Sequence, residues 1–252
     1  MLNPVLFNMG PFEIRYYGLL MALAFLIGYF ILRKLSNEFE ISEKQAEDFF
    51  IYALLSLIVG ARLFEVLFYD PSYYFSNPIK ILYVWEGGLA SHGAIILTFI
   101  VAILYSKLKN IKFYNLADLF IIPIALGASF VRIGNFINNE LVGRVTNVPW
   151  AVKFSGYEGL RHPVQLYQAS YLFVIFLILF KIRKLKDRKP GIILWSFLLL
   201  DSMFRFITEF FKDLPKDYGF YLYNLNLAQY FSVAIVIISL IMLIRMFKIK
   251  DE

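Results

Sequence analysis

The amino-acid sequence predicts an all-α protein, a polytopic membrane helix bundle of seven transmembrane helices in a single domain over residues 1–252. Hydrophobic residues make up 60% of the chain, charged residues only 17%, and the mean hydropathy is +0.64. A soluble domain has roughly 45–50% apolar residues. The excess is gathered in long runs, which is typical of segments that cross a membrane.

Seven apolar runs are long enough to cross the hydrocarbon core of a bilayer, which takes about 20 helical residues. The third run gives the weakest signal, because it is short and begins at His92. The expected spans are residues 16–32, 49–69, 92–108, 116–136, 164–180, 191–211 and 227–247.

Lysine and arginine residues are distributed unequally between the two sides of these spans. The loops after the first, third and fifth spans and the C-terminal tail, with the basic residues at the adjoining helix ends, carry 15 of them, against 7 on the opposite side. Because short cytoplasmic loops carry the basic excess, the N-terminus is expected outside and the C-terminus in the cytoplasm. The basic tract 181–189 is explained by this topology alone, so no nucleic-acid partner is expected.

With this orientation, unusual polar residues of five helices share one depth. Arg62, Arg132 and Arg205 each lie toward the outer end of a span that runs outward, and Tyr17 and His92 open spans that begin on the outer side. Ionisable groups inside a bilayer are costly and are functional by default. Charges with separate structural roles would not be expected to lie at the same depth in the membrane. The sequence therefore predicts a polar site in the outer leaflet.

The segment VRIGNFINNELVGR places polar residues where the fourth span ends. Asn135 and Asn138 disfavour helix, and Gly143 allows close backbone approach to a ligand. Arg132 has no acidic residue at helical spacing on its N-terminal side, and Glu140 is expected to lie beyond the helix. Because a guanidinium matches phosphate and stays charged when partly desolvated, Arg132 is expected to bind an anionic ligand at headgroup depth.

Two of these arginines have a carboxylate at helical spacing. Glu65 follows Arg62 by three residues and Glu209 follows Arg205 by four, so each pair lies on a common helix face. An intrahelical ion pair that makes burial tolerable is an open alternative to ligand binding, and it is favoured more for Arg62 than for Arg205.

The chain contains two histidines and no cysteine. His92, in WEGGLASHGAI, is flanked by glycines at the predicted polar depth, so it is expected to be a general base, with a merely interfacial position as the alternative. His162 precedes Pro163 at the start of the fifth span and is expected to be structural or interfacial. The absence of cysteine excludes a cysteine nucleophile in this chain. Without HExxH, P-loop or aspartate-rich motifs, neither a metal nor a cofactor is expected.

The motifs resemble those of the bacterial prolipoprotein diacylglyceryl transferases along most of the chain. Six blocks stand in that family's order: RYYG, GARLFEVLFY, WEGGLASHGA, RIGNFINNELVGR, RHPVQLYQ and RFITEFFK. The chain departs from the family pattern at Ala61, Ala94 and Val131, where glycine is usual. None of these departures removes an expected reacting group.

The resemblance implies an enzyme of the bacterial inner membrane, a transferase of an alkyl group. It would move the diacylglyceryl group of phosphatidylglycerol to the lipobox cysteine of a preprolipoprotein, forming a thioether and releasing glycerol phosphate. Its partners would be phosphatidylglycerol, the preprolipoprotein signal peptide and membrane lipids. We expect His92 to act as general base and Arg132 and Arg205 to stabilise the leaving phosphate.

The remaining expected site residues support this chemistry. Tyr17, Asn135 and Glu140 would orient headgroup hydroxyls and phosphate, while Glu209 would hold Arg205 and Glu65 would hold Arg62. A transporter for an anionic solute is the rival interpretation, although no internal repeat of the kind common in transporters is evident. A membrane scaffold whose charges form simple ion pairs is a third.

Overall fold

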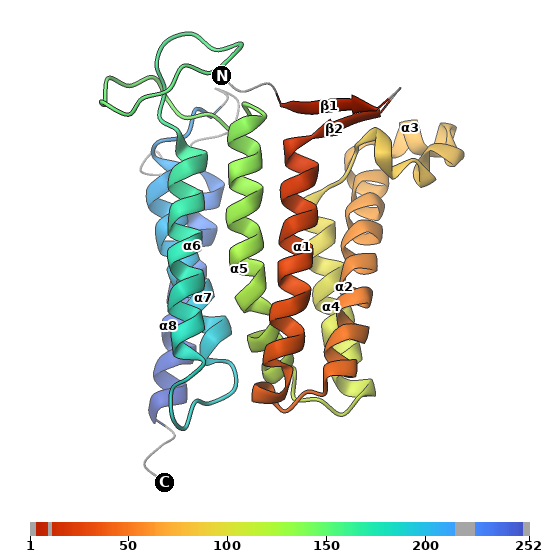
Figure 1. Ribbon diagram of the computed structural model, residues 1–252, viewed down its shortest axis with the longest axis vertical. Coiled ribbons are helices and arrows are strands. Elements are labelled where there is room, and N and C mark those ends of the chain that lie inside the picture. The colour runs from red at the N-terminus through yellow and green to blue at the C-terminus, as the bar shows by residue number, and fades with distance from the viewer. Residues whose placement is uncertain (1–3, 10–11, 215–224, 249–252) are drawn as a thin grey trace. The chain divides into compact units, whose positions relative to one another are not determined.

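The computed structural model describes residues 4–9, 12–214 and 225–248, and most of them are helical (Figure 1). The chain forms two compact units. Unit 1 contains Met1–Phe30 and Phe120–Glu252, and unit 2 contains Ile31–Leu119. Helix α1 (Tyr16–Leu35) passes from unit 1 into unit 2, and α5 (Phe113–Ile137) passes back.

Unit 2 is built on the packing of α2 (Glu43–Phe64) against α4 (Ser91–Leu108). The hydroxyl groups of Ser56 and Thr98 hydrogen-bond between the two helices at 3.0 Å. Near the C-terminal end of α2, a Cβ at Gly60 would collide with the carbonyl of Gly93 on α4, and a Cβ at Gly93 would collide with the carbonyl of Gly60. In lipid there is no hydrophobic driving force between helices, so their association depends on close packing. Small residues at a crossing allow this packing, because they let the two helix backbones approach each other.

A connection of short helices joins α2 to α4 in unit 2. A π-helical turn (Glu65–Tyr69) extends α2, and it is followed by α3 (Pro71–Ser76). Two 3-10 turns, Pro78–Leu82 and Val84–Glu86, then lead to α4. This connection surrounds the side chain of Arg62, as described below.

Unit 1 consists of part of α1, most of α5, and α6 (Val164–Ile182), α7 (Ile192–Glu209) and α8 (Leu227–Lys248). Helix α7 packs against both α6 and α8. A two-stranded hairpin, β1 (Val5–Met9) and β2 (Phe12–Arg15), precedes α1. Figure 1 shows this hairpin and the long α5–α6 loop at one end of unit 1, and the α6–α7 loop at the opposite end.

Helices α1 and α5 pack antiparallel within unit 1, as three glycine positions show. Gly28 lies against Pro123, with 3.6 Å from an ideal Cβ to the proline Cβ, and Gly127 lies against Ala24 at 3.7 Å. Further along, Gly134 lies against the ring of Tyr17, which would collide with any Cβ at that position. This contact fixes the ring of Tyr17 beside the last turns of α5.

The predicted helical membrane protein is confirmed, and the helix bounds agree with the expected spans to within a few residues. Six helices in the described residues are long and apolar enough to cross a membrane: Tyr16–Phe39, Glu43–Tyr69, Ser91–Leu108, Phe113–Ile137, Val164–Ile182 and Leu227–Lys248. Helix α7 forms where a seventh span was expected, but it carries Asp201, Arg205 and Glu209 among 18 residues. The β1–β2 hairpin was not predicted.

Candidate functional site

The helix α5 ends at Ile137, and the chain turns sharply after it. The backbone N–H of Glu140 donates to the carbonyl of Asn135 at 2.9 Å. Asn139 and Leu141 then adopt left-handed φ angles of 58° and 53°. Such angles are strained for a leucine and better tolerated by an asparagine. Glu140 therefore lies beyond the helix, as predicted.

The carboxylate of Glu140 is held by both asparagines that the sequence singled out. Asn135 Nδ2 donates to Oε2 at 2.7 Å and Asn138 Nδ2 donates to Oε1 at 3.1 Å. Gln165 on α6 donates to the Glu140 carbonyl at 2.5 Å. The other side of the Asn135 amide, its Oδ1, accepts from Arg132 Nη1 at 3.3 Å. Four predicted site residues thus form one hydrogen-bonded network.

Tyr17 joins this network from α1. Its ring packs on Gly134, and its hydroxyl group is within electrostatic range of Glu140 and Arg132. The phenol therefore lies beside a carboxylate and a guanidinium that the sequence places more than 100 residues further on. Tyr17 and Arg132, which the sequence places at one depth, thus lie near each other in unit 1.

The two arginines expected to bind phosphate lie in one cluster of charges in unit 1. Arg132 of α5 interacts electrostatically with Arg205, Asp201 and Glu209 of α7. Arg132 is half-buried and Arg205 is exposed on the protein surface. Two guanidinium groups of like charge repel each other, so bringing them together is favourable only when anions compensate. The arrangement suits an anionic ligand.

The predicted pairing of Glu209 with Arg205 is replaced by another. In the described part of the chain, Glu209 accepts an ion-paired hydrogen bond from Lys212 Nζ at 2.6 Å. The Glu209 side chain is only 3% exposed and that of Lys212 only 13%. Burial lowers the pKa of Lys212, while the neighbouring Glu209 raises it and Arg205 and Arg132 lower it further. The lysine satisfies Glu209 and leaves Arg205 to other partners.

Gly143 joins the α5–α6 loop to the end of α7 rather than facing open space. Its N–H donates to the His162 carbonyl at 3.2 Å, and a Cβ at this position would collide with His162. The next residue, Arg144, donates its N–H to Phe211 at 2.8 Å and its Nε to the Lys212 carbonyl at 3.0 Å. Gly143 and Arg144 together therefore fix the loop that carries Glu140 relative to the end of α7.

Several polar residues of this region were not identified from the sequence. Asp201, at four residues before Arg205, shows the same helical spacing as the pairs considered, and that spacing could have revealed it. Tyr171, which hydrogen-bonds to Asp201, gives no local signal because its partner is on another helix. Gln165 is likewise defined only by a tertiary contact, whereas Lys212 bonds to Glu209 only three residues earlier.

In unit 2, Arg62 does not have the predicted partner. Its Nη1 donates to the Tyr74 hydroxyl at 2.6 Å and to the Gly88 carbonyl at 3.1 Å, and its Nη2 donates to the Tyr83 carbonyl. The residue is 4% exposed. The expected ion pair with Glu65 is therefore wrong for the described structure. Helical spacing brought the pair to one face, but the α2–α4 connection supplied better-placed acceptors.

This geometry predicts that Arg62 stabilises the connection. Arg62→Lys keeps the charge but loses the fork that reaches three acceptors, so we expect a loss of about 2–3 kcal/mol in stability. Thermal unfolding in detergent measures the loss, and trypsin cleavage after Lys80 should accelerate. Glu65→Gln is the matched control and should change neither, whereas equal effects of the two variants would restore the ion-pair interpretation.

His92 lies in the first turn of α4, in unit 2, and its ring is exposed. Its Nδ1 is 3.3 Å from the Tyr69 hydroxyl, and its ring lies 6.0 Å from that of Phe64. His162, in unit 1, is partly buried against Phe211 and bonds through Nδ1 to the Tyr167 hydroxyl at 3.1 Å. The more enclosed His162 agrees with a structural role.

The fold and these clusters define a multi-pass helical membrane protein with a two-arginine site suited to an anionic ligand. More specifically, the chain belongs to the prolipoprotein diacylglyceryl transferase family, whose model matches residues 4–245. This match covers nearly all the described residues of both units. The resemblance stated from the sequence motifs is thereby confirmed.

Relatives named phosphatidylglycerol–prolipoprotein diacylglyceryl transferase align over almost the whole chain. The protein of Geobacter sulfurreducens is 36% identical over 245 residues, covering 96% of this chain and 94% of the relative. That of Tolumonas auensis is 37% identical over 252 residues, covering 98% and 97%. That of Rickettsia typhi is 38% identical over 253 residues, covering 97% of each.

Proposed function

We propose that this chain transfers the diacylglyceryl group of phosphatidylglycerol to the lipobox cysteine of a preprolipoprotein. The observation that carries this proposal is the family match over residues 4–245, with relatives that bear the name of this activity. Those relatives are named as transferases, so the transporter and scaffold interpretations are not retained. The arginine cluster of α5 and α7 is chemically suited to an anionic phospholipid.

The reaction is a displacement at a glyceryl carbon. The acceptor cysteine loses its thiol proton to a base, and the sulfur attacks the carbon that bears the phosphate oxygen. A carbon–sulfur bond forms while the carbon–oxygen bond breaks, and the bonding electron pair stays on the phosphate oxygen. Glycerol phosphate leaves with the additional negative charge. No cysteine of the enzyme is needed, because the acceptor supplies the thiol.

Arg132 and Arg205 are the groups that we assign to the leaving phosphate. Donors fixed before the reaction stabilise developing charge without the cost of reorganising solvent. Arg132 is held by Asn135 at 3.3 Å, and Asn135 is itself held by Glu140 at 2.7 Å. We assign Tyr17, Asn135, Asn138 and Glu140 to orienting the headgroup, because they surround Arg132 in this network.

His92 is the base in this proposal. Free cysteine has a pKa of about 8.5, so only a small fraction is thiolate near neutral pH. When Nδ1 of His92 donates to the Tyr69 hydroxyl 3.3 Å away, Nε2 is left as the acceptor for the thiol proton. The exposure of the ring is consistent with access by a substrate. Arg62 anchors the connection that precedes His92 in the chain.

We further propose seven membrane spans, with α7 as the additional one, an external N-terminus and a cytoplasmic C-terminus, in the bacterial inner membrane. Helix α7 is 18 residues long, and the three ionisable side chains that lower its apolar character include Arg205, which we assign to the leaving phosphate. The basic residues of 181–189 support the orientation. The family match across both units supports treating residues 1–252 as one transferase domain.

The activity is tested with purified full-length protein in detergent micelles. Phosphatidylglycerol labelled in its glyceryl-phosphate headgroup and in its acyl chains is supplied with a lipobox peptide. We expect acyl label to move to the peptide in a thioether, and one equivalent of labelled glycerol phosphate to be released. A peptide with serine in place of the cysteine should accept nothing. Headgroup release without transfer to the peptide would contradict the proposal.

A further inference from the structure

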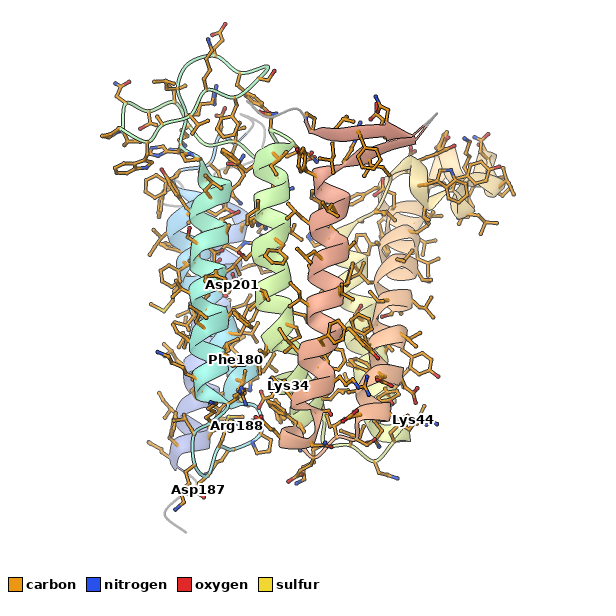
Figure 2. The ribbon with its side chains drawn as sticks, in the orientation of Figure 1. Lys34, Lys44, Phe180, Asp187, Arg188 and Asp201 are labelled. Atoms are coloured by element: carbon orange, nitrogen blue, oxygen red, sulfur yellow. The ribbon has the colours of Figure 1, made fainter. Side chains whose placement is uncertain are left out.

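Asp201 is a carboxylate in the middle of α7 that the proposed reaction does not use. It lies nine residues from the start of the helix at Ile192 and is only partly exposed. In Figure 2, Asp201 lies in the middle part of the unit 1 bundle, whereas Asp187 and Arg188 lie at its lower end. An acidic residue at such a position in a span is costly, so its retention calls for a functional or structural reason.

The side chain of Asp201 is fixed from α6. The hydroxyl of Tyr171 hydrogen-bonds to the Asp201 carboxylate. The Tyr171 ring stacks on Phe204 of α7 with 5.2 Å between ring centroids and an interplanar angle of 13°. Phe204 and Asp201 are three residues apart on α7 and so lie on the same face of that helix. This face therefore holds both the ring and the hydroxyl of Tyr171. The carboxylate therefore has a defined position.

Both arginines of the proposed phosphate site interact with this carboxylate. Arg205 follows Asp201 by one helical turn on α7, and Arg132 approaches from α5. Two guanidinium groups and one hydrogen-bond donor therefore act on this carboxylate from three helices. The other anion that acts on Arg132 is Glu209, and Lys212 neutralises it in a direct ion pair.

The net charge of the cluster then matches the substrate rather than the product. Within this α5–α7 cluster, two arginines and one aspartate carboxylate leave a single positive charge, and the Glu209–Lys212 pair adds none. Glu140 is not counted, because its carboxylate bonds to Asn135 rather than to Arg132. A phosphodiester such as the phosphatidylglycerol headgroup carries a single negative charge. A phosphate monoester such as glycerol phosphate carries close to two near neutral pH, because its second pKa is about 6. Binding the donor neutralises the site, whereas the product leaves it negative.

We propose that Asp201, positioned by Tyr171, sets the charge of the two-arginine site so that it holds a singly charged phosphodiester and releases the doubly charged phosphate monoester. This inference rests on the proposed function, and it makes Asp201 a positioning and selectivity residue rather than a catalytic one. Without the carboxylate, two uncompensated guanidinium groups would retain the product. Turnover would then be limited by release of glycerol phosphate.

The test compares two soluble inhibitors of the transferase assay at about pH 7.5. Glycerol phosphate represents the dianionic product, and glycerophosphoglycerol represents the monoanionic headgroup. In the wild-type enzyme, we expect glycerophosphoglycerol to inhibit at least as tightly as glycerol phosphate. In Asp201→Asn, the ratio of the two inhibition constants should shift about tenfold in favour of glycerol phosphate, the lower end of the effect expected of a charge within 4–6 Å.

Two further variants separate this charge effect from a loss of structure. Asp187→Asn makes the same chemical change at the lower end of unit 1 in Figure 2, away from Asp201, where the left-handed φ of 58° also suits asparagine, and it should leave the ratio unchanged. Tyr171→Phe removes the hydrogen bond but keeps the carboxylate, and should shift the ratio in the same direction by less. A purely structural role of Asp201 would weaken both inhibitors equally.

The outcomes distinguish this inference from the proposed function. An active wild-type enzyme that binds glycerol phosphate much more tightly than glycerophosphoglycerol overturns the charge match, even if Asp201→Asn cannot be purified. So does an active Asp201→Asn enzyme with an unchanged ratio. Failure of the wild-type enzyme to transfer diacylglyceryl groups to the peptide would instead contradict the proposed function itself.

Discussion

Replacing Arg132 with glutamine is expected to lower kcat by about a hundredfold, equivalent to roughly 3 kcal/mol of transition-state stabilisation. The guanidinium is placed by Asn135 at 3.3 Å and shares a cluster with Arg205. Glutamine keeps an N–H donor on a shorter side chain but carries no charge to compensate the leaving phosphate. Because this charge develops during bond cleavage, kcat should fall more than KM rises.

The measurement is the initial rate of diacylglyceryl transfer over a range of phosphatidylglycerol concentrations. Arg132→Lys should recover only part of the rate, since an ammonium supplies charge without the planar fork. Arg245→Gln is the matched control, because Arg245 lies exposed in the last turn of α8, and it should retain nearly full activity. Near-normal turnover of Arg132→Gln would remove Arg132 from the reaction.

The helices of this protein were predictable because the bilayer imposes a strict rule on the sequence. Backbone groups in lipid must be satisfied within the segment, so a long apolar run has to be helical. Span 164–180, for example, was observed as Val164–Ile182. The β1–β2 hairpin before Tyr16 escaped prediction. Its strands have only five and four residues, and no comparable constraint acts outside the apolar runs.

The site was predictable where its residues are close in the sequence. Arg132, Asn135 and Glu140 lie within nine residues, and hydrogen bonds join them much as a polar segment at a helix end suggests. Predictions based on helical spacing alone were weaker. Spacing shows which side chains share a helix face, but it does not show which hydrogen-bond acceptors other elements bring to that face. For Arg62 those acceptors included the Tyr74 hydroxyl.

The same limit explains the absence of Asp201 from the predicted site, whereas the partner of Glu209 was missed for a local reason. Lys212 follows Glu209 by three residues, beyond the last turn of α7, where the sequence suggested a loop. Asp201 gains its significance from Tyr171 and Arg132, which belong to α6 and α5. Polar groups brought together by three helices cannot be recognised as a cluster before the helix faces are known.

His92→Gln is expected to lower kcat/KM by at least about a hundredfold, within the range of 10²–10⁴ that general-base catalysis contributes. Glutamine can still bond to Tyr69, which lies 3.3 Å from the histidine Nδ1, but it cannot accept the thiol proton. A protonated imidazole cannot accept it either, so the wild-type rate should fall as pH decreases. In the variant, the rate should instead follow the ionisation of the peptide thiol. It should therefore approach the wild-type rate only at high pH, where the thiol ionises unaided.

The matched control is His162→Gln, which changes the other histidine of the chain at a position bonded to Tyr167 and packed on Phe211. It is expected to lower stability modestly while leaving the shape of the pH–rate profile intact. The two profiles, measured with the same lipobox peptide, separate a proton acceptor from a histidine that packs. If His92→Gln is slow but retains the wild-type pH dependence, His92 positions a substrate, and the thiol proton must be taken by another group.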